Sequence, residues 1–191
     1  MSEEAVLHPV LGPLLRYWGE KRDGRLMPER KQIDPLEMGA GLLPHLVLCD
    51  LFDRGNRARF RLIGTNVVRR WGFDPTGQTL DEELGAYFAL LGELHHAAFA
   101  ERAPIHSVSA FKWGVNRELE AHHLLLPLSK GAFEPAIALV GIAFRSDEVF
   151  PPQIRTLNGI ARHEERHRAI VELPSELERA ASPRVSGRSV A

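Results

Sequence analysis

Residues 42–63 read LLPHLVLCDLFDRGNRARFRLI, and this stretch decides the fold. Residues 42–52 form a near-continuous apolar run that is short enough for a buried strand. Residues 53–56 (DRGN) have the composition of a turn. In residues 57–63 three arginines alternate with apolar side chains, and this period of two is typical of a half-buried strand. The stretch therefore predicts a β-hairpin that packs one face on a core.

The rest of the chain supplies helices and further strands whose order fits one sheet. Apolar residues recur at helical spacing in four segments and form strand-like runs in three others. Helices are predicted at Val10–Lys21, Thr65–Trp71, Asp81–Glu101 and Gln153–Val171, and strands at Ile105–Trp113, Leu119–Leu128 and Pro135–Phe144. The last three strands have short connections, which predict an antiparallel meander, while the helices before them must cross over the sheet.

This order predicts an α+β fold: a five-stranded antiparallel sheet with crossover helices on one face, plus an N-terminal and a C-terminal helix. The expected parts are a helix with an irregular lead-in at 1–41, the core at 42–145, a helical extension at 146–173 and a disordered tail at 174–191. A sheet of this size needs cover on its second face. Either the first helix or a partner subunit is expected to provide that cover.

Composition and charge exclude several classes of protein. The chain has 191 residues, of which 44% are hydrophobic and 26% charged, so a single domain with a proper core is expected. A formal net charge of −1 provides no general field for nucleic acid or an acidic membrane surface. One cysteine, Cys49, rules out an internal disulfide. The absence of an 18-residue apolar run and the acidic N-terminus predict a cytoplasmic protein without a membrane partner.

The order and spacing of the predicted elements resemble the PAS fold, and five short motifs carry a narrower family resemblance. They are Lys31–Pro35 (KQIDP), Leu43–Leu46 (LPHL), Arg59–Thr65 (RFRLIGT), Gly72–Gly77 (GFDPTG) and Leu126–Ser129 (LPLS). More narrowly, the chain resembles a bacterial family of stand-alone PAS-like proteins over about residues 10–145. Residues 130–132 (KGA) depart from that family, in which this turn tends to be acidic.

The resemblance implies a sensory or interaction module with a small-molecule site between the sheet and the crossover helices. Aromatic residues, histidines and one leucine of the predicted helices and strands are the candidates for this pocket: Trp71, Tyr87, Leu91, His95, His106, Trp113 and His123. The resemblance also implies a homodimer that pairs through its N-terminal helix. The apolar stripe of that helix supplies the candidate contacts Leu11, Leu14, Leu15 and Trp18.

The spacing of the histidines does not predict a metal site. His163 and His167 match the letters of the HExxH protease motif, but a solvated charged helix is the favoured interpretation. His95 borders the apolar stripe of its helix, where some PAS domains place a haem ligand. A partly buried histidine bonded to the backbone is favoured over haem. Cys49 lies in a strand, so a packed thiol is favoured and flavin photochemistry through a thiol is not supported.

Two polar features interrupt the hairpin. Asp50 and His45 are polar residues in or beside the apolar first strand, and buried polar groups need partners. A structural role is favoured for both over a role in ligand binding. The arginines at 57, 59 and 61 form a stripe that could hold an anionic ligand or partner carboxylates. A solvated face is the favoured interpretation of that stripe.

No catalytic set stands out, and the leading hypothesis is therefore non-enzymatic. It is a sensory or regulatory module that binds a small molecule, a protein partner or both, and signals to a separate protein. One alternative is a small hydrolase or isomerase that uses His106 or His123 with Asp50. A further alternative is a homo-oligomerisation or assembly module without a ligand, which docks through its N-terminal helix.

Overall fold

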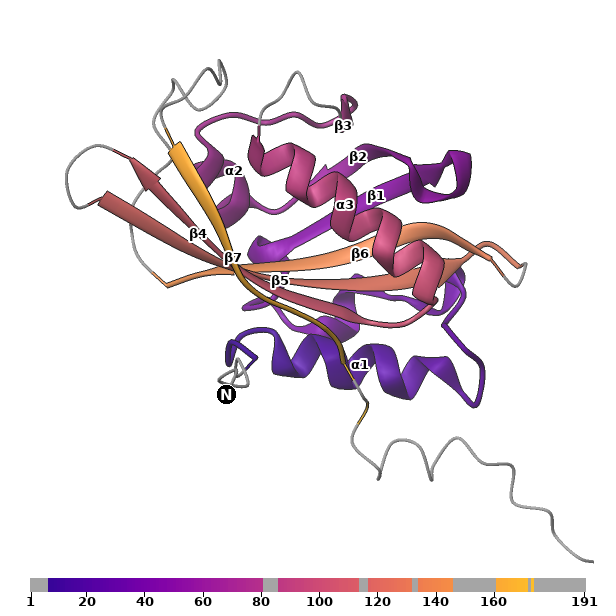
Figure 1. Ribbon diagram of the computed structural model, residues 1–191. Coiled ribbons are helices and arrows are strands. Elements are labelled where there is room, and N and C mark those ends of the chain that lie inside the picture. The colour runs from indigo at the N-terminus through magenta and orange to yellow at the C-terminus, as the bar shows by residue number, and fades with distance from the viewer. Residues whose placement is uncertain are drawn as a thin grey trace, which may run out of the picture.

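The chain folds around one seven-stranded antiparallel sheet (Figure 1). The computed structural model describes residues 7–80, 86–113, 117–131, 134–145, 161–171 and 173. The strand order is β3-β2-β1-β6-β5-β4-β7. The strands are β1 Leu46–Phe52, β2 Arg57–Ile63, β3 Thr79–Leu80, β4 Ile105–Trp113, β5 Arg117–Ser129, β6 Pro135–Phe144 and β7 Ala161–Ile170. The helices are α1 Gly12–Arg22, α2 Thr65–Trp71 and α3 Ala86–Glu101, with short 3-10 turns at Arg30–Gln32, Pro35–Met38, Leu43–His45 and Asp53–Gly55.

The predicted hairpin is present. β1 and β2 pair antiparallel from Val47↔Ile63 to Phe52↔Arg57, with a bulge between Leu48 and Cys49. Ala58 and Phe60 of β2 are buried in the core while its three arginines stay exposed, as the alternation predicted. Leu62, which the alternation placed on the buried face, is exposed instead, because the bulge interrupts the alternation just before it. The meander of β4, β5 and β6 is also confirmed, because each of these strands pairs antiparallel with the next.

Two strands were not predicted, so the expectation of five strands is wrong. β3 is a two-residue edge strand that pairs with β2. β7 lies where the C-terminal helix Gln153–Val171 was expected; residues 153–160 of that segment fall outside the described residues. Residues 162–168 of β7 are all charged residues or histidines, and this pattern resembles a solvated helix when it is considered alone.

The edge of β4 explains why β7 is a strand. An unpaired strand edge carries a row of free N–H and C=O groups, and β7 satisfies them along its whole length. Its charges then find partners across the sheet: Glu164 bonds to Lys112 at 2.9 Å and Arg166 to Glu118 at 2.6 Å. Backbone pairing and cross-strand charge pairs therefore outweigh a weak helical pattern.

The two faces of the sheet are covered by different helices (Figure 1). α2 and α3 pack on one face, called here the inner face. α1 packs on the opposite face, called here the outer face, where the Trp18 indole N–H donates to the carbonyl of Pro127 at 2.9 Å. A methyl group at Gly141 of β6 would lie 2.7 Å from the side chains of Leu11 and Leu14, so this glycine allows α1 to approach the sheet closely.

The first helix, rather than a partner subunit, thus covers the outer face within this chain. All four candidate dimer contacts on this helix are buried in the chain itself: Leu11, Leu14, Leu15 and Trp18. A dimer contact through them would require α1 to leave the sheet. None of the helices in the described ranges is long and apolar enough to cross a membrane.

Candidate functional site

Aromatic rings fill the space between the inner face of the sheet and helices α2 and α3. The rings meet edge to face, with centroids from 4.9 Å (Tyr87 and Phe111) to 6.2 Å (Phe60 and Phe88) apart. Trp71 of α2 contacts both Tyr87 and Phe88 of α3. Such edge-to-face packing adds to the stabilisation from burial alone.

A buried hydrogen bond links this aromatic layer to the sheet. The hydroxyl of Tyr87 lies 3.0 Å from Nε2 of His123 on β5. Burial raises the pKa of Tyr87. The nearby indole N–H of Trp71 lowers this pKa by a smaller amount, although its geometry is not that of a full hydrogen bond. The phenol is therefore neutral at physiological pH and can donate or accept. The structure brings together three of the predicted pocket residues at this point, with Leu91 of α3 buried in the same layer.

Replacing Tyr87 by phenylalanine should lower the free energy of unfolding by about 1–3 kcal/mol, because it removes a buried hydrogen bond and keeps the ring. Urea denaturation measures this loss. The matched control is Tyr17→Phe, since the Tyr17 hydroxyl bonds to Glu37 and to the Asp34 backbone at an exposed site, where water can replace these partners and the loss should cost less. An equal cost for the two substitutions would contradict the buried Tyr87–His123 bond.

Two further polar side chains are buried near the inner face. His95 of α3 has its Nδ1 2.5 Å from the carbonyl oxygen of Leu91, while its Nε2 has no partner among the described residues. Burial lowers the pKa of His95 to about 4, so its ring is neutral at pH 7. The hydroxyl of Ser109 on β4 is also buried without a described partner. His95 thus has the backbone bond that the sequence interpretation favoured.

The concave surface next to this layer is an open groove along α3. Its volume is about 510 Å³. The groove is lined by Asn56, Leu80, Phe88, Ala89, Gly92, Glu93, His96, Ala97 and Arg168. Leu80 and Phe88 also belong to the inner core, so the groove and the aromatic layer share these two side chains. No sequence signal marked this groove, because it depends on how α3 lies beside β3 and β7.

His106, a predicted pocket residue, lies on the wrong face. On β4 it pairs with Leu124, whose side chain belongs to the outer core, whereas Ser107 pairs with His123. Alternate residues of a strand point to opposite faces, so His106 cannot share a pocket with His123. The backbone of Trp113 ends β4, and its side chain is outside the described structure.

His106 instead belongs to a row of histidine rings on the outer face, which the sequence analysis missed. Its ring stacks on His122 at 5.8 Å and lies 5.5 Å from His167 of β7. His8 contacts His122 at 5.4 Å, and Glu120 lies 3.2 Å from His122 Nε2. Burial, followed by the neighbouring His122 and His167, lowers the pKa of His106 to about 4.

These histidines do not assemble a metal centre. Within the described ranges, no three His, Cys, Asp or Glu side chains are placed to share an ion. The HExxH helix is not formed, because residues 161–170 are a strand. At about 3.3 Å per residue, His163 and His167 are about 13 Å apart along it. Cys49 is buried, and burial raises the pKa of its thiol, as expected for a packed cysteine.

Asp50 lies on the outer face and accepts from three cations: Arg59 at 3.5 Å, Arg61 at 3.3 Å and Lys130 at 3.2 Å. His123 lies on the inner face, because its neighbour Leu124 belongs to the outer core, so it is on the opposite face from Asp50. His106 shares the face of Asp50 but lies three strands away, which is about 14 Å across the sheet, and is also offset along the strands. The expected pairing of Asp50 with either histidine is wrong, and the hydrolase alternative loses its site.

Comparison with known proteins gives one match. A family model described as a PAS domain matches residues 6–143. Neither the comparison with curated proteins nor that with solved structures finds a match.

Proposed function

Because this chain belongs to the PAS domain family, we propose that it is a non-enzymatic sensor that binds a small molecule beneath α3 and signals to a separate protein. The family supports a sensory or regulatory role in general terms, and PAS domains are generally non-enzymatic. The ligand and the route of the signal are our proposal.

One observation carries the ligand part. The Tyr87–His123 hydrogen bond, the unpartnered Nε2 of His95 and the buried hydroxyl of Ser109 are polar features of a mainly apolar layer. Buried polar groups are costly unless they are satisfied, so they often mark a binding role. Movement of Phe88 and Leu80 would connect this layer to the groove along α3. The groove is within the size range of small-molecule sites.

A thermal-shift screen of polar aromatic and amphiphilic metabolites tests the proposal, together with native mass spectrometry of the purified chain. A ligand at about 100 times its Kd should stabilise the fold by about 2.7 kcal/mol, which is a rise of several degrees in Tm. We expect at least one compound to produce this rise. No rise with any compound, together with a native mass equal to that of the bare chain, would reject the ligand-sensing role.

A pair of substitutions on α3 locates the site. Gly92→Phe should fill the groove and weaken binding of the hit compound at least about tenfold, because Gly92 lines it. Ala100→Phe is the matched control, since Ala100 is exposed on the same helix and does not line the groove. Equal affinities of the two variants for the hit compound would place the ligand elsewhere.

A further inference from the structure

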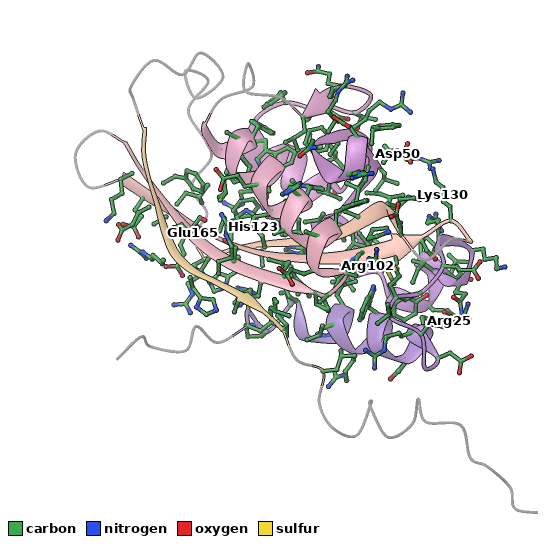
Figure 2. All side chains as sticks on the ribbon, turned by 45° about the vertical axis from the view of Figure 1, so that its right-hand side comes forward. Arg25, Asp50, Arg102, His123, Lys130 and Glu165 are labelled. Carbon is green, nitrogen blue, oxygen red and sulfur yellow. The ribbon has the colours of Figure 1, made fainter. Side chains whose placement is uncertain are left out.

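The outer face carries a cationic surface at the end of the sheet that α1 does not cover. We call Phe52, Asp50, Arg59, Arg61 and Lys130 the arginine patch. The three cations come from β2 and from the residue after β5, and all reach the carboxylate of Asp50 at 3.2–3.5 Å. Figure 2 shows Asp50 and Lys130 at the same end of the molecule.

The charges of the patch are not balanced. The Asp50 side chain is only 8% exposed, whereas those of Arg59, Arg61 and Lys130 are 50%, 48% and 54% exposed. One buried carboxylate therefore lies beneath three half-exposed cations, and two positive charges are left over. Each arginine donates to Asp50 through one terminal nitrogen. A guanidinium has five N–H donors and favours two-point contacts with carboxylates, so both arginines have donors to spare for a second carboxylate.

Exposed apolar side chains lie beside these charges. The guanidinium carbon of Arg59 is 5.3 Å from the centre of the Phe52 ring, and this ring is 43% exposed. Leu62 of β2 pairs with Leu48, whose side chain packs on the outer core, and is 53% exposed on this face. Aromatic and arginine side chains together are typical of the parts of protein interfaces that contribute most to binding.

We propose that the arginine patch binds an acidic segment of a partner protein that carries at least one apolar side chain. A small oxyanion could bind the outward-facing donors of the cations, but it would leave Phe52 and Leu62 exposed. A peptide segment can place its carboxylates on the outward sides of Arg59 and Arg61 and cover both apolar side chains. This inference rests on the proposed signalling to a separate protein, but not on the site beneath α3.

Selection from a random dodecapeptide display library against the intact chain tests the patch. We expect enrichment of peptides that combine Asp or Glu with Leu, Phe or Trp. The strongest peptide, synthesised with a fluorescent label, is then titrated by anisotropy at low and high salt. Binding should weaken as salt rises, because exposed charges are screened.

Three variants assign this binding to the patch. Arg59→Gln with Arg61→Gln should weaken it at least about tenfold, and Phe52→Ala should weaken it about threefold or more. Arg16→Gln with Arg69→Gln removes the same charge from exposed positions elsewhere and should change affinity less than about twofold. Urea denaturation confirms that each variant is folded.

Several results would overturn the inference. They are a selected set without acidic enrichment, equal losses in the two double variants, or competition by inorganic pyrophosphate together with no effect of Phe52→Ala. The last result would indicate a small-oxyanion site. Failure here would leave the thermal-shift response of the site beneath α3 unchanged, so the two proposals fail separately.

Discussion

Replacing Trp18 by alanine should lower the free energy of unfolding by about 3–5 kcal/mol, the range for truncating a large core aromatic. Trp18 is fully buried between α1 and the outer face, and its indole N–H donates to the carbonyl of Pro127. The substitution leaves a cavity in the outer core and removes a buried hydrogen bond. Typical domains have only about 5–15 kcal/mol of stability, so the effect should be plain in urea denaturation.

Two comparisons separate burial from other effects of the substitution. Trp18→Phe keeps part of the ring and should cost less than Trp18→Ala. Leu36→Ala removes a leucine that is 88% exposed and should change stability by less than about 0.5 kcal/mol. If Trp18→Ala costs no more than Leu36→Ala, α1 is not docked on the sheet in solution and its apolar stripe would be free for a partner.

The sequence predicts the helix, but it does not show whether the helix docks on the chain's own sheet. Leu11, Leu14, Leu15 and Trp18 recur at helical spacing, and this spacing predicts a helix with one apolar face. It does not say whether that face meets the chain's own sheet or a second copy. Gly141, which makes room for two of these leucines, lies more than a hundred residues away and gives no local signal.

Segments with one buried face were predicted well, and the segment stabilised by edge pairing was not. β2 alternates because one face is buried, so its period is visible locally. β7 has charged residues on both faces, and it is a strand only because β4 offers an open edge. A preference set by tertiary pairing cannot be read from a local pattern.

The site was predicted in part for the same reason. Tyr87 and His123 were both pocket candidates, and the structure joins them. His106 was misplaced because the register of β4 against β5 decides which face it occupies, and register depends on pairing. The arginine stripe was seen, but its contact with Asp50 and Lys130 depends on the pairing of β1 with β2 and on the turn after β5.

Lowering the pH from about 7 to about 4 should remove much of the stability of this fold. His95 and His106 have their pKa lowered to about 4, mainly by burial, against an ordinary value of 6.5. About one pH unit above 6.5, both are almost entirely neutral whether the chain is folded or not. Between pH 6.5 and 4 the unfolded chain binds protons that the folded chain does not, so stability falls with pH. Each histidine can account for up to about 3 kcal/mol.

Urea denaturation in steps from pH 7.5 to 4 measures this dependence, and two variants assign it. His95→Leu removes one buried titrating ring and should flatten the slope below pH 6.5 by about one proton, while stability at pH 7 changes by less than about 1 kcal/mol. His96→Leu, at the exposed neighbouring position of α3, is the matched control for the loss of a histidine ring. Carboxylates such as Glu120, whose pKa is also lowered, make stability depend on pH mainly below about pH 4.5, and they do so equally in all three proteins. If His95→Leu keeps the full wild-type slope, the ring of His95 is not held neutral by burial beneath α3, and the inner layer must open to water more readily than its packing implies.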